Sequence, residues 1–291
     1  MSIRDRIVAR VTSFTTLPAV AHKLMSLLDD PEADPAEMAK IIQLDPALTA
    51  NVLKAANSAF LGFTRPVTTV TEADFRIGTK WMFQIALSSL VFSSLKTPAR
   101  GYDLSAEDLW RHSIAVALMA ENLCRLLNIK DSGAIFTSGL IHDIGKIAMQ
   151  GFVDDYFEEL QHLAEGDDIA FEEAESKLLG TDHAEVGALI AEKWRFPQSI
   201  VDDIRWHHNP EGAPEPQEGI DIVHISDAMC LMEGFGLGRD GLQYRMCYKS
   251  ILRLKLTSQV MEAACSQLLL SIKNAENMFS GATASPAVAR R

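Results

Sequence analysis

Seven side chains that could bind a metal stand out in this 291-residue sequence, although they lie far apart along the chain. They are His112, the adjacent pair His142 and Asp143, His183, the adjacent pair His207 and His208, and Asp227. The chain has eight histidines, and five of them belong to this set. Imidazole and carboxylate ligands together suit iron, manganese, nickel or zinc better than calcium. Buried groups of this kind are costly unless they are paired or bind a metal, so we expect them to converge on one centre.

Each of these residues also has an ordinary interpretation. A single histidine on an apolar helix is usually a hydrogen-bonded core residue, Asp227 could be a buried acid with a hydrogen-bond partner, and His207–His208 could complement a helix dipole. Lys146, one turn after His142, could be a solvated surface residue or could stabilise negative charge beside the centre. Gly145 removes side-chain bulk, which would let a ligand or a facing helix approach closely. The ordered set, rather than any single member, favours the metal site.

The overall composition restricts the possible partners. A net charge of −12 argues against sequence-independent binding to nucleic acid and against charge-driven binding to anionic lipid. The first ten residues, MSIRDRIVAR, lack the apolar core of a signal peptide, and no stretch is apolar enough for a membrane helix. The four cysteines form no C-x-x-C pair, as expected of free thiols in a reducing compartment. We therefore expect a cytoplasmic protein with no membrane segment.

The periodic segments have the helical period, so the expected fold class is all-α. A break at residues 97–101, TPARG, divides an N-terminal group of short helices from the segments that carry the candidate ligands. Those later helices are expected to begin at Ser105, Asp131, Asp182 and Pro197. In this interpretation His142, Asp143 and Lys146 lie within one helix, and Asp227 lies inside a further apolar helix.

The ordered set resembles the HD superfamily of metal-dependent phosphohydrolases. The pattern of that superfamily is a histidine, a His-Asp pair and a distant aspartate, and it falls here on His112, His142–Asp143 and Asp227. The resemblance implies an HD-type helical core that binds divalent metal.

The HD-GYP branch, which hydrolyses cyclic dinucleotides with two or three metals, is similar in further motifs. These are HDIGK at 142–146, HAEVG at 183–187 and the His207–His208 pair. Asp108, one turn before His112, occupies the place of an additional acidic ligand in some members of that branch. After His208 the chain reads NPEGAPEP and lacks the Gly-Tyr-Pro element that helps to hold the substrate there.

Residues 17–60 resemble the beginning of the HDOD domain, with DPALT at 45–49 and AANSAF at 55–60 as the most specific segments. The resemblance extends over roughly residues 10–230. HDOD proteins are bacterial signalling and regulatory proteins, and many have lost the metal ligands and act through protein contacts. This chain differs because it keeps a full apparent ligand set.

The break and the resemblances together predict an N-terminal helical subdomain over residues 1–100 and an HD-type helical subdomain over 101–275. The small and polar residues at the C-terminus predict a disordered tail over 276–291. The first interpretation is an HDOD regulatory protein with a metal site and a protein partner in a signalling pathway. One alternative is an active phosphodiesterase acting on a cyclic nucleotide or cyclic dinucleotide. The other is a metal-free scaffold for protein contacts.

The enzymatic interpretation assigns a role to each residue of the set. The resemblance implies that Asp143 bridges two divalent transition-metal ions. His112, His142 and Asp227 would complete one ion's ligands, and His183, His207 and His208 the other's. Lys146 would stabilise the anionic oxygens of the phosphate, so Asp143 and Lys146 are the expected catalytic residues.

Overall fold

The structure, a computed structural model, describes residues 1–14, 19–27, 35–57, 65–95, 97–130, 132–239 and 244–279. Within these ranges the structure is helical, with one isolated antiparallel bridge between Ala99 and Leu104 and no strand. The predicted all-α fold class is confirmed. The predicted helix start at Asp131 and the part of the predicted tail from Ser280 onward lie outside the described residues.

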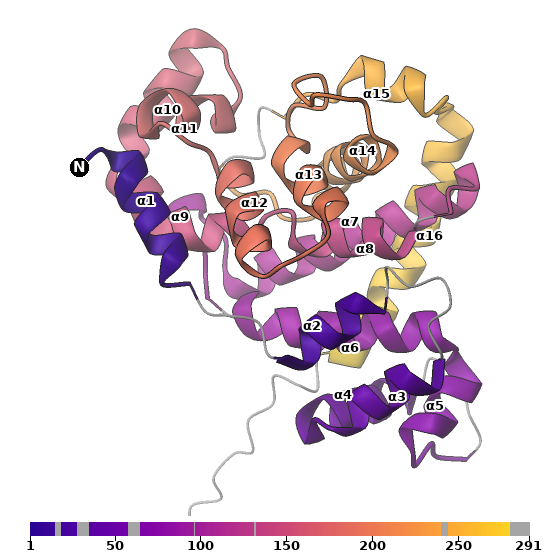
Figure 1. Ribbon diagram of the computed structural model, residues 1–291. Coiled ribbons are helices and arrows are strands. Elements are labelled where there is room, and N and C mark those ends of the chain that lie inside the picture. The colour runs from indigo at the N-terminus through magenta and orange to yellow at the C-terminus, as the bar shows by residue number, and fades with distance from the viewer. Residues whose placement is uncertain are drawn as a thin grey trace, which may run out of the picture. The chain divides into compact units, whose positions relative to one another are not determined.

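The chain divides into two compact units (Figure 1). Unit 1 comprises Met1–Leu17 and Val91–Leu268, and unit 2 comprises Pro18–Leu90 and Leu269–Arg291. The helices of unit 2 are α2 (Ala19–Ser26), α3 (Pro35–Gln43), α4 (Pro46–Ala56) and α5 (Val70–Ile77), and α6 (Thr79–Leu95) and α16 (Ser258–Phe279) extend across the unit boundaries. Unit 1 contains α1 (Ile3–Thr12), the 3-10 helix η2 (Arg100–Tyr102), α7 (Ala106–Leu127), α8 (Ser132–Ile141), α9 (Ile144–Asp155), α10 (Phe157–Asp167), α11 (Phe171–Leu179), α12 (His183–Lys193), α13 (Gln198–Trp206), α14 (Glu218–Met232) and α15 (Tyr248–Arg253).

Unit 2 is built from short amphipathic helices. Pro46 occupies the first position of α4, and the carboxylate of Asp45 accepts a hydrogen bond from the Leu48 amide, as expected at a helix start. The apolar side chains Ile42 of α3 and Val52 of α4 are fully buried, and α5 packs against both helices. These helices contain none of the seven candidate ligands.

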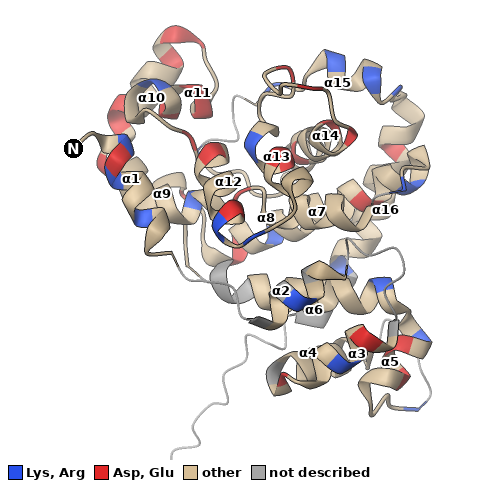
Figure 2. Ribbon diagram, viewed as in Figure 1, with Lys and Arg blue, Asp and Glu red and all other residues tan. Residues whose placement is uncertain are grey.

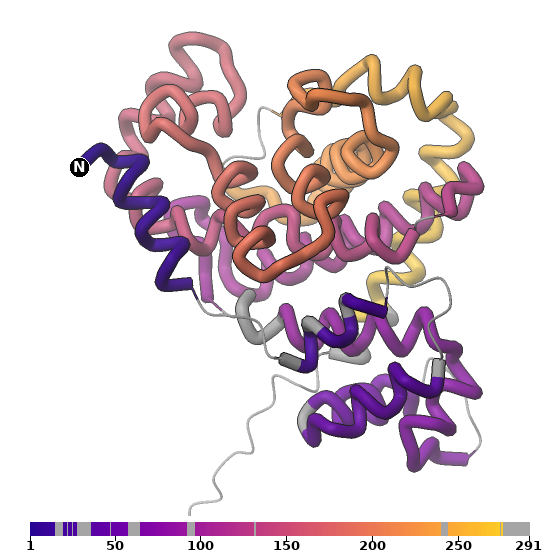
Figure 3. The backbone as a smooth tube through the Cα atoms, in the orientation of Figure 1, coloured from indigo at the N-terminus to yellow at the C-terminus, as the bar shows by residue number. Residues whose placement is uncertain are grey.

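Helix α7 forms the centre of unit 1. Ser105 caps it by accepting a hydrogen bond from the Asp108 amide, and the helix is buried along most of its length. It packs against α8 and α14, and α13 packs against α8 and α14 in turn. Figure 3 shows α13 and α14 in orange beside the magenta helices α7 and α8. Polar side chains that these four helices direct inward are therefore enclosed by other helices.

The C-terminal end of helix α1 contacts the end of α12 within unit 1. The ammonium of Lys193, at the end of α12, donates to the carbonyl oxygens of Val11, Thr12 and Phe14. Carbonyls at the end of a helix carry partial negative charge, so a cation is a favourable cap there. The buried ring of Trp194 lies 5.9 Å from the Phe14 ring, which adds apolar contact at the same place.

The described helices show neither the basic surface nor the long apolar segment that the composition argued against. In the part of the chain that the structure describes, no helix is drawn basic along its whole length (Figure 2). No described helix combines the length and the apolar character needed to span a bilayer. The four cysteines are free thiols, and Cys124 and Cys230 are buried.

Candidate metal centre

All seven candidate ligands gather in the interior of unit 1, where they form two adjoining groups of donor atoms. The first group is Asp143, His183, His207 and His208, and the second is His112, His142 and Asp227. Within each group the donor atoms lie within 4.8 Å of one another. We call these seven residues the His/Asp cluster. The sequence signal therefore identified residues that the fold brings together.

The Asp143 carboxylate lies between the two groups. Its Oδ2 is 3.4 Å from Nε2 of His142 and 3.5 Å from Nε2 of His112, and its Oδ1 is 3.5 Å from Nε2 of His183. Asp227 closes the second group, with its Oδ1 3.1 Å from Nε2 of His112. One oxygen of Asp143 thus faces each group, which is the arrangement that a bridging carboxylate requires.

The backbone around the His-Asp pair differs from the prediction. His142 and Asp143 do not lie within a continuous helix, because α8 ends at Ile141 and α9 begins at Ile144. Asp143 is the N-cap residue of α9 with φ −94° and ψ 9°, and its carbonyl accepts a hydrogen bond from the Lys146 amide. The turn, rather than a helix face, allows adjacent side chains to point into one centre.

Each of four histidines is oriented through its Nδ1 atom. Three of these atoms lie against backbone carbonyls: His112 at 3.0 Å from Phe235 O, His142 at 2.8 Å from Gly139 O, and His207 at 2.7 Å from Ile204 O. The fourth, Nδ1 of His183, lies 2.7 Å from Oε2 of Glu175. Carbonyl and carboxylate oxygens can only accept, so Nδ1 carries a proton in all four rings and Nε2 faces the cluster, where it can give a lone pair to a metal once any second proton has left. This is how metal-binding histidines are usually held.

Several donor atoms of the cluster are buried without a hydrogen-bond partner among the described residues. They are Nε2 of His142, Nε2 of His207, Nδ1 of His208, Oδ1 of Asp143 and Oδ1 of Asp227. Each such atom costs about 1–3 kcal/mol if nothing binds it. Their chemical types are those that bind transition metals, so the residues present fit a metal centre.

The charges of the cluster depend on one another. Burial alone would raise the pKa of Asp143, but the charges of His142 and Lys146 hold it well below its usual range. Burial likewise opposes the ionised form of Asp227, yet the neighbouring His112 and His142 hold the pKa of this carboxyl below its usual range. Both carboxylates are therefore anionic at neutral pH, as metal ligands must be.

Three histidines of the cluster have pKa values that are shifted in opposite directions. Burial lowers the pKa of His207 to about 3 and also lowers that of His208, so both are neutral. Burial would also lower the pKa of His183, but the charge of Glu175 and its hydrogen bond outweigh burial and raise the value to about 9. His183 therefore holds a proton at neutral pH that a metal would displace.

These shifts predict how the stability of the metal-free protein depends on pH. Below about pH 6.5 His207 and His208 take up protons in the unfolded chain but stay neutral in the folded chain. The free energy of unfolding therefore falls as the pH is lowered, by up to about 1.4 kcal/mol per pH unit for each histidine. Above about pH 6.5 the folded chain keeps the His183 proton that the unfolded chain has lost, so this stabilisation disappears as pH approaches 9. Urea unfolding of chelator-treated protein should therefore show a maximum near neutral pH. A flat profile would contradict it.

Lys146 lies at the edge of the cluster rather than in solvent. It is buried, with its Nζ 2.7 Å from Oδ2 of Asp143 and 5.6 Å from the centre of the Tyr102 ring. Gly145 beside it is needed for packing, because a Cβ there would overlap the carbonyl oxygen of His183 on α12. The predicted close approach of a facing helix at Gly145 is confirmed.

Asp108 is not part of the cluster. Its side chain is exposed at the start of α7, where Oδ2 accepts a hydrogen bond of 2.6 Å from the Ser105 hydroxyl. One turn before His112, Asp108 takes part in the hydrogen bonds that cap the N-terminus of α7.

The sequence patterns did not predict the residues that hydrogen-bond to the members of the His/Asp cluster. Glu175 is fully buried, accepts hydrogen bonds from the His183 amide and ring, and accepts a third from the Tyr102 hydroxyl at 2.5 Å. His224 holds the backbone of the cluster, since its Nδ1 lies 2.6 Å from the carbonyl oxygen of His207. No spacing pattern marked Glu175, which precedes His183 by eight residues on a separate helix.

A small cavity adjoins the first group of the His/Asp cluster at His208. It has a volume of about 110 Å³, and its walls include His208, Tyr244, Glu172 and Arg245. The Tyr244 ring lies 5.3 Å from the His208 ring and so forms part of the cover over that ligand.

Known proteins share the sequence family and the fold. The profile of the HDOD domain matches residues 14–210. An HDOD domain protein of unknown function from Geobacter sulfurreducens is 23% identical, covering 95% of this chain and 96% of that one, with a TM-score of 0.69. A proposed phosphohydrolase from Shewanella amazonensis SB2B is 20% identical, covering 94% and 96%, with a TM-score of 0.70. A proposed signal transduction protein from Marinobacter aquaeolei VT8 is 20% identical, covering 96% and 66%, with a TM-score of 0.73. These likenesses show the fold.

A longer relative is also similar in sequence. An uncharacterised protein of Treponema pallidum (strain Nichols) is 24% identical over 211 residues, which are 71% of this chain and 40% of that protein. This chain thus spans less than half the length of that relative.

Proposed function

Because this chain belongs to the HDOD family, as its sequence motifs predicted, we propose that it is a regulatory protein whose helical core binds two divalent transition-metal ions. The observation that carries the proposal is the set of buried donor atoms without hydrogen-bond partners in the His/Asp cluster. A metal-free scaffold would have to bear the cost of all of them, which argues against that alternative.

The geometry supports a division of the ligands between two ions. His112, His142 and Asp227 would hold one ion, and His183, His207 and His208 the other, with Asp143 between them. Bound ions would act as Lewis acids and would lower the pKa of water. The chain itself keeps the carboxylates anionic, fixes the tautomers of four histidines and encloses the cluster between helices.

Elemental analysis of protein purified without chelator tests the proposal. We expect about two equivalents of iron, manganese, nickel or zinc per chain, because the cluster offers two adjoining sets of ligands. His112→Ala should lose one equivalent and keep the other, since it removes a ligand from one group alone. Substoichiometric metal in every preparation, with no uptake on addition of these metals, would refute the metal site.

Two observations favour regulation over cyclic-dinucleotide hydrolysis. The cavity beside His208 has a volume of about 110 Å³, whereas pockets for drug-sized ligands typically have about 300–1,000 Å³. The Gly-Tyr-Pro substrate element is also missing after His208. A centre of this kind can report metal occupancy to a protein partner, and one structural relative is itself a proposed signal transduction protein.

Phosphate-ester hydrolysis is the second candidate, and Lys146 is the observation that favours it. Its ammonium reaches the edge of the cluster beside Asp143, where it could bind an anionic oxygen. Under the regulatory proposal, metal-loaded protein should hydrolyse bis-p-nitrophenyl phosphate and cyclic dinucleotides no faster than Lys146→Met does. Turnover that falls by about 100-fold or more in Lys146→Met would instead establish the enzyme.

A further inference from the structure

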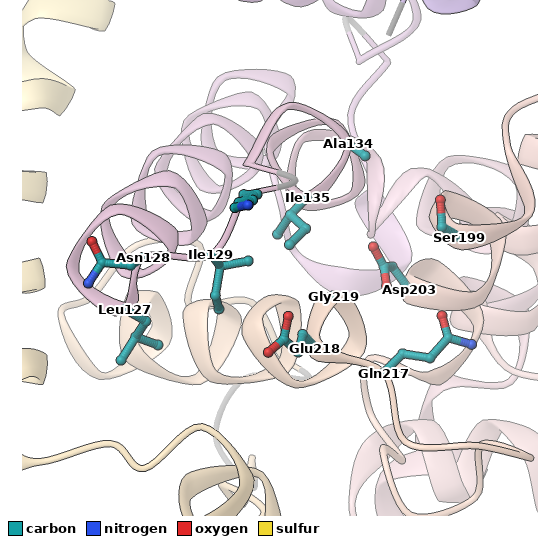
Figure 4. A pocket seen from close by; sticks show the side chains of 11 residues that line it. Leu127, Asn128, Ile129, Ala134, Ile135, Ser199, Asp203, Gln217, Glu218 and Gly219 are labelled. Carbon is teal, nitrogen blue, oxygen red and sulfur yellow. The ribbon is translucent and has the colours of Figure 1, made fainter. Parts of the chain in front are cut away.

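A larger cavity lies at the far ends of the helices that carry the His/Asp cluster (Figure 4). Its volume is about 480 Å³, within the typical range of small-molecule sites. The end of α7, the beginnings of α8 and α14, and the first half of α13 form its walls. Each of these helices carries, or leads directly to, a cluster residue: His112, His142, Asp227 and His207, respectively. We call it the distal cavity.

The walls of the distal cavity combine apolar surface with negative charge. Figure 4 shows the side chains of Ile129 and Ile135 across from the carboxylates of Asp203 and Glu218. Lys130 is the only basic residue among the eleven that line the cavity. Asp203 is 2% exposed, whereas Glu218 is exposed and forms no side-chain hydrogen bond or ion pair in the described part of the chain. This chemistry fits a cationic nitrogen attached to an apolar body.

A hydrogen bond at the wall of the distal cavity joins two of the helices that lead to the cluster. The Ser138 hydroxyl of α8 donates to Oδ2 of Asp203 on α13 at 2.7 Å. About one helical turn further along the chain, just past the ends of these two helices, lie His142 and His207, whose ring centroids are 5.0 Å apart. A Cβ at Gly219 would overlap the Asp203 carboxylate, so α14 is also packed against this carboxylate.

We propose that the distal cavity binds a small organic cation, an ammonium or guanidinium group on an apolar body, and that its occupancy alters the metal affinity of the cluster. A ligand that displaces Asp203 would shift α8 and α13 together, because Ser138 ties the two helices. The binding part stands on the cavity alone, whereas the coupling part rests on the proposed metal site.

Phenethylammonium is a suitable probe for binding, with phenethyl alcohol as its uncharged counterpart. Titration of metal-free protein, followed by NMR and calorimetry, should give saturable binding of the cation and at least about tenfold weaker binding of the alcohol. Glu218→Gln should weaken cation binding by about tenfold. Glu215→Gln removes the same charge from an exposed loop position outside the cavity lining, and it should bind as wild type does. Equal binding of cation and alcohol, or equal losses in both variants, would overturn the proposal.

The coupling is tested by competing a chromogenic chelator for the metal with and without saturating phenethylammonium. We expect the apparent metal affinity to change by about fivefold or more, and bound metal to change the affinity for the cation by the same factor. Cation binding with unchanged metal affinity would overturn the coupling. If the protein binds no metal, the proposed function and the coupling fail together, while the first experiment still decides whether the cavity binds a cation.

Discussion

Chelation is expected to lower the melting temperature of the wild-type protein by about 10 °C and that of Asp143→Asn by less than about 3 °C. A ligand present at a thousand times its dissociation constant stabilises the folded state by about 4 kcal/mol, and a domain of this size gains roughly 2–4 °C per kcal/mol. Asp143 faces both groups of the cluster, so its loss should weaken both ions. Differential scanning calorimetry with and without chelator measures the two shifts.

The choice of asparagine, and of the control, follows from the structure. Alanine would remove the group that pairs with the buried ammonium of Lys146, whereas asparagine retains an acceptor oxygen. Asp108→Asn makes the same substitution at an exposed residue outside the cluster, and it should respond to chelator as wild type does. If Asp143→Asn responds as strongly as wild type, the stabilising metal lies elsewhere. If Asp108→Asn loses the response, Asp108 is a ligand after all.

Glu175→Gln is expected to reduce metal affinity by about tenfold or more, although Glu175 is not itself in the cluster. Groups that hydrogen-bond to a ligand's outer nitrogen typically contribute 10–100-fold, in rough terms, because they fix the ring and raise its basicity. Glutamine keeps the shape and an acceptor but removes the charge that raises the pKa of His183 to about 9. Competition with a chelator of known affinity gives the change.

A second readout separates positioning from general damage. The pKa of His183 can be followed by NMR in metal-free protein. It should be lower in Glu175→Gln than the value of about 9 in wild type, because the negative charge that stabilises the protonated ring is gone. Tyr102→Phe removes one hydrogen bond to Glu175 and leaves the carboxylate, so it should change affinity by much less. An unchanged His183 pKa together with unchanged metal affinity would show that Glu175 serves the fold alone.

The members of the His/Asp cluster could be picked out from the sequence because their types are rare and their spacing is ordered. His112 lies on a capped helix and Asp227 on an apolar one, and the periodicity that predicts those helices also predicts that these side chains are enclosed. The supporting residues could not be predicted in this way. In the sequence Glu175 is one of many acids on helical segments, and only the packing of α11 against α12 turns it toward His183.

The turn at His142–Asp143 shows a second limit of sequence patterns. Residues 132–155 are apolar enough to be interpreted as one helix, and neither proline nor a capping side chain marks the break. The break depends on contacts that are distant in sequence, notably α12 against Gly145. Asp108 shows the opposite case, because the same acid suits a ligand pattern and a helix start, and the described fold uses it for the latter.

The seven members of the cluster come from chain segments that are more than a hundred residues apart at the extremes, from His112 to Asp227. Ions held jointly by these segments would act as crosslinks, closing long loops that the unfolded chain leaves open. As with a disulfide across a long loop, most of the stabilisation would come from reducing the entropy of the unfolded chain. This stabilisation grows only slowly with the length of the loop. Depletion of metal in the cell would therefore do more than empty a sensor. It would shorten the lifetime of the folded protein and make its abundance a second readout of metal supply.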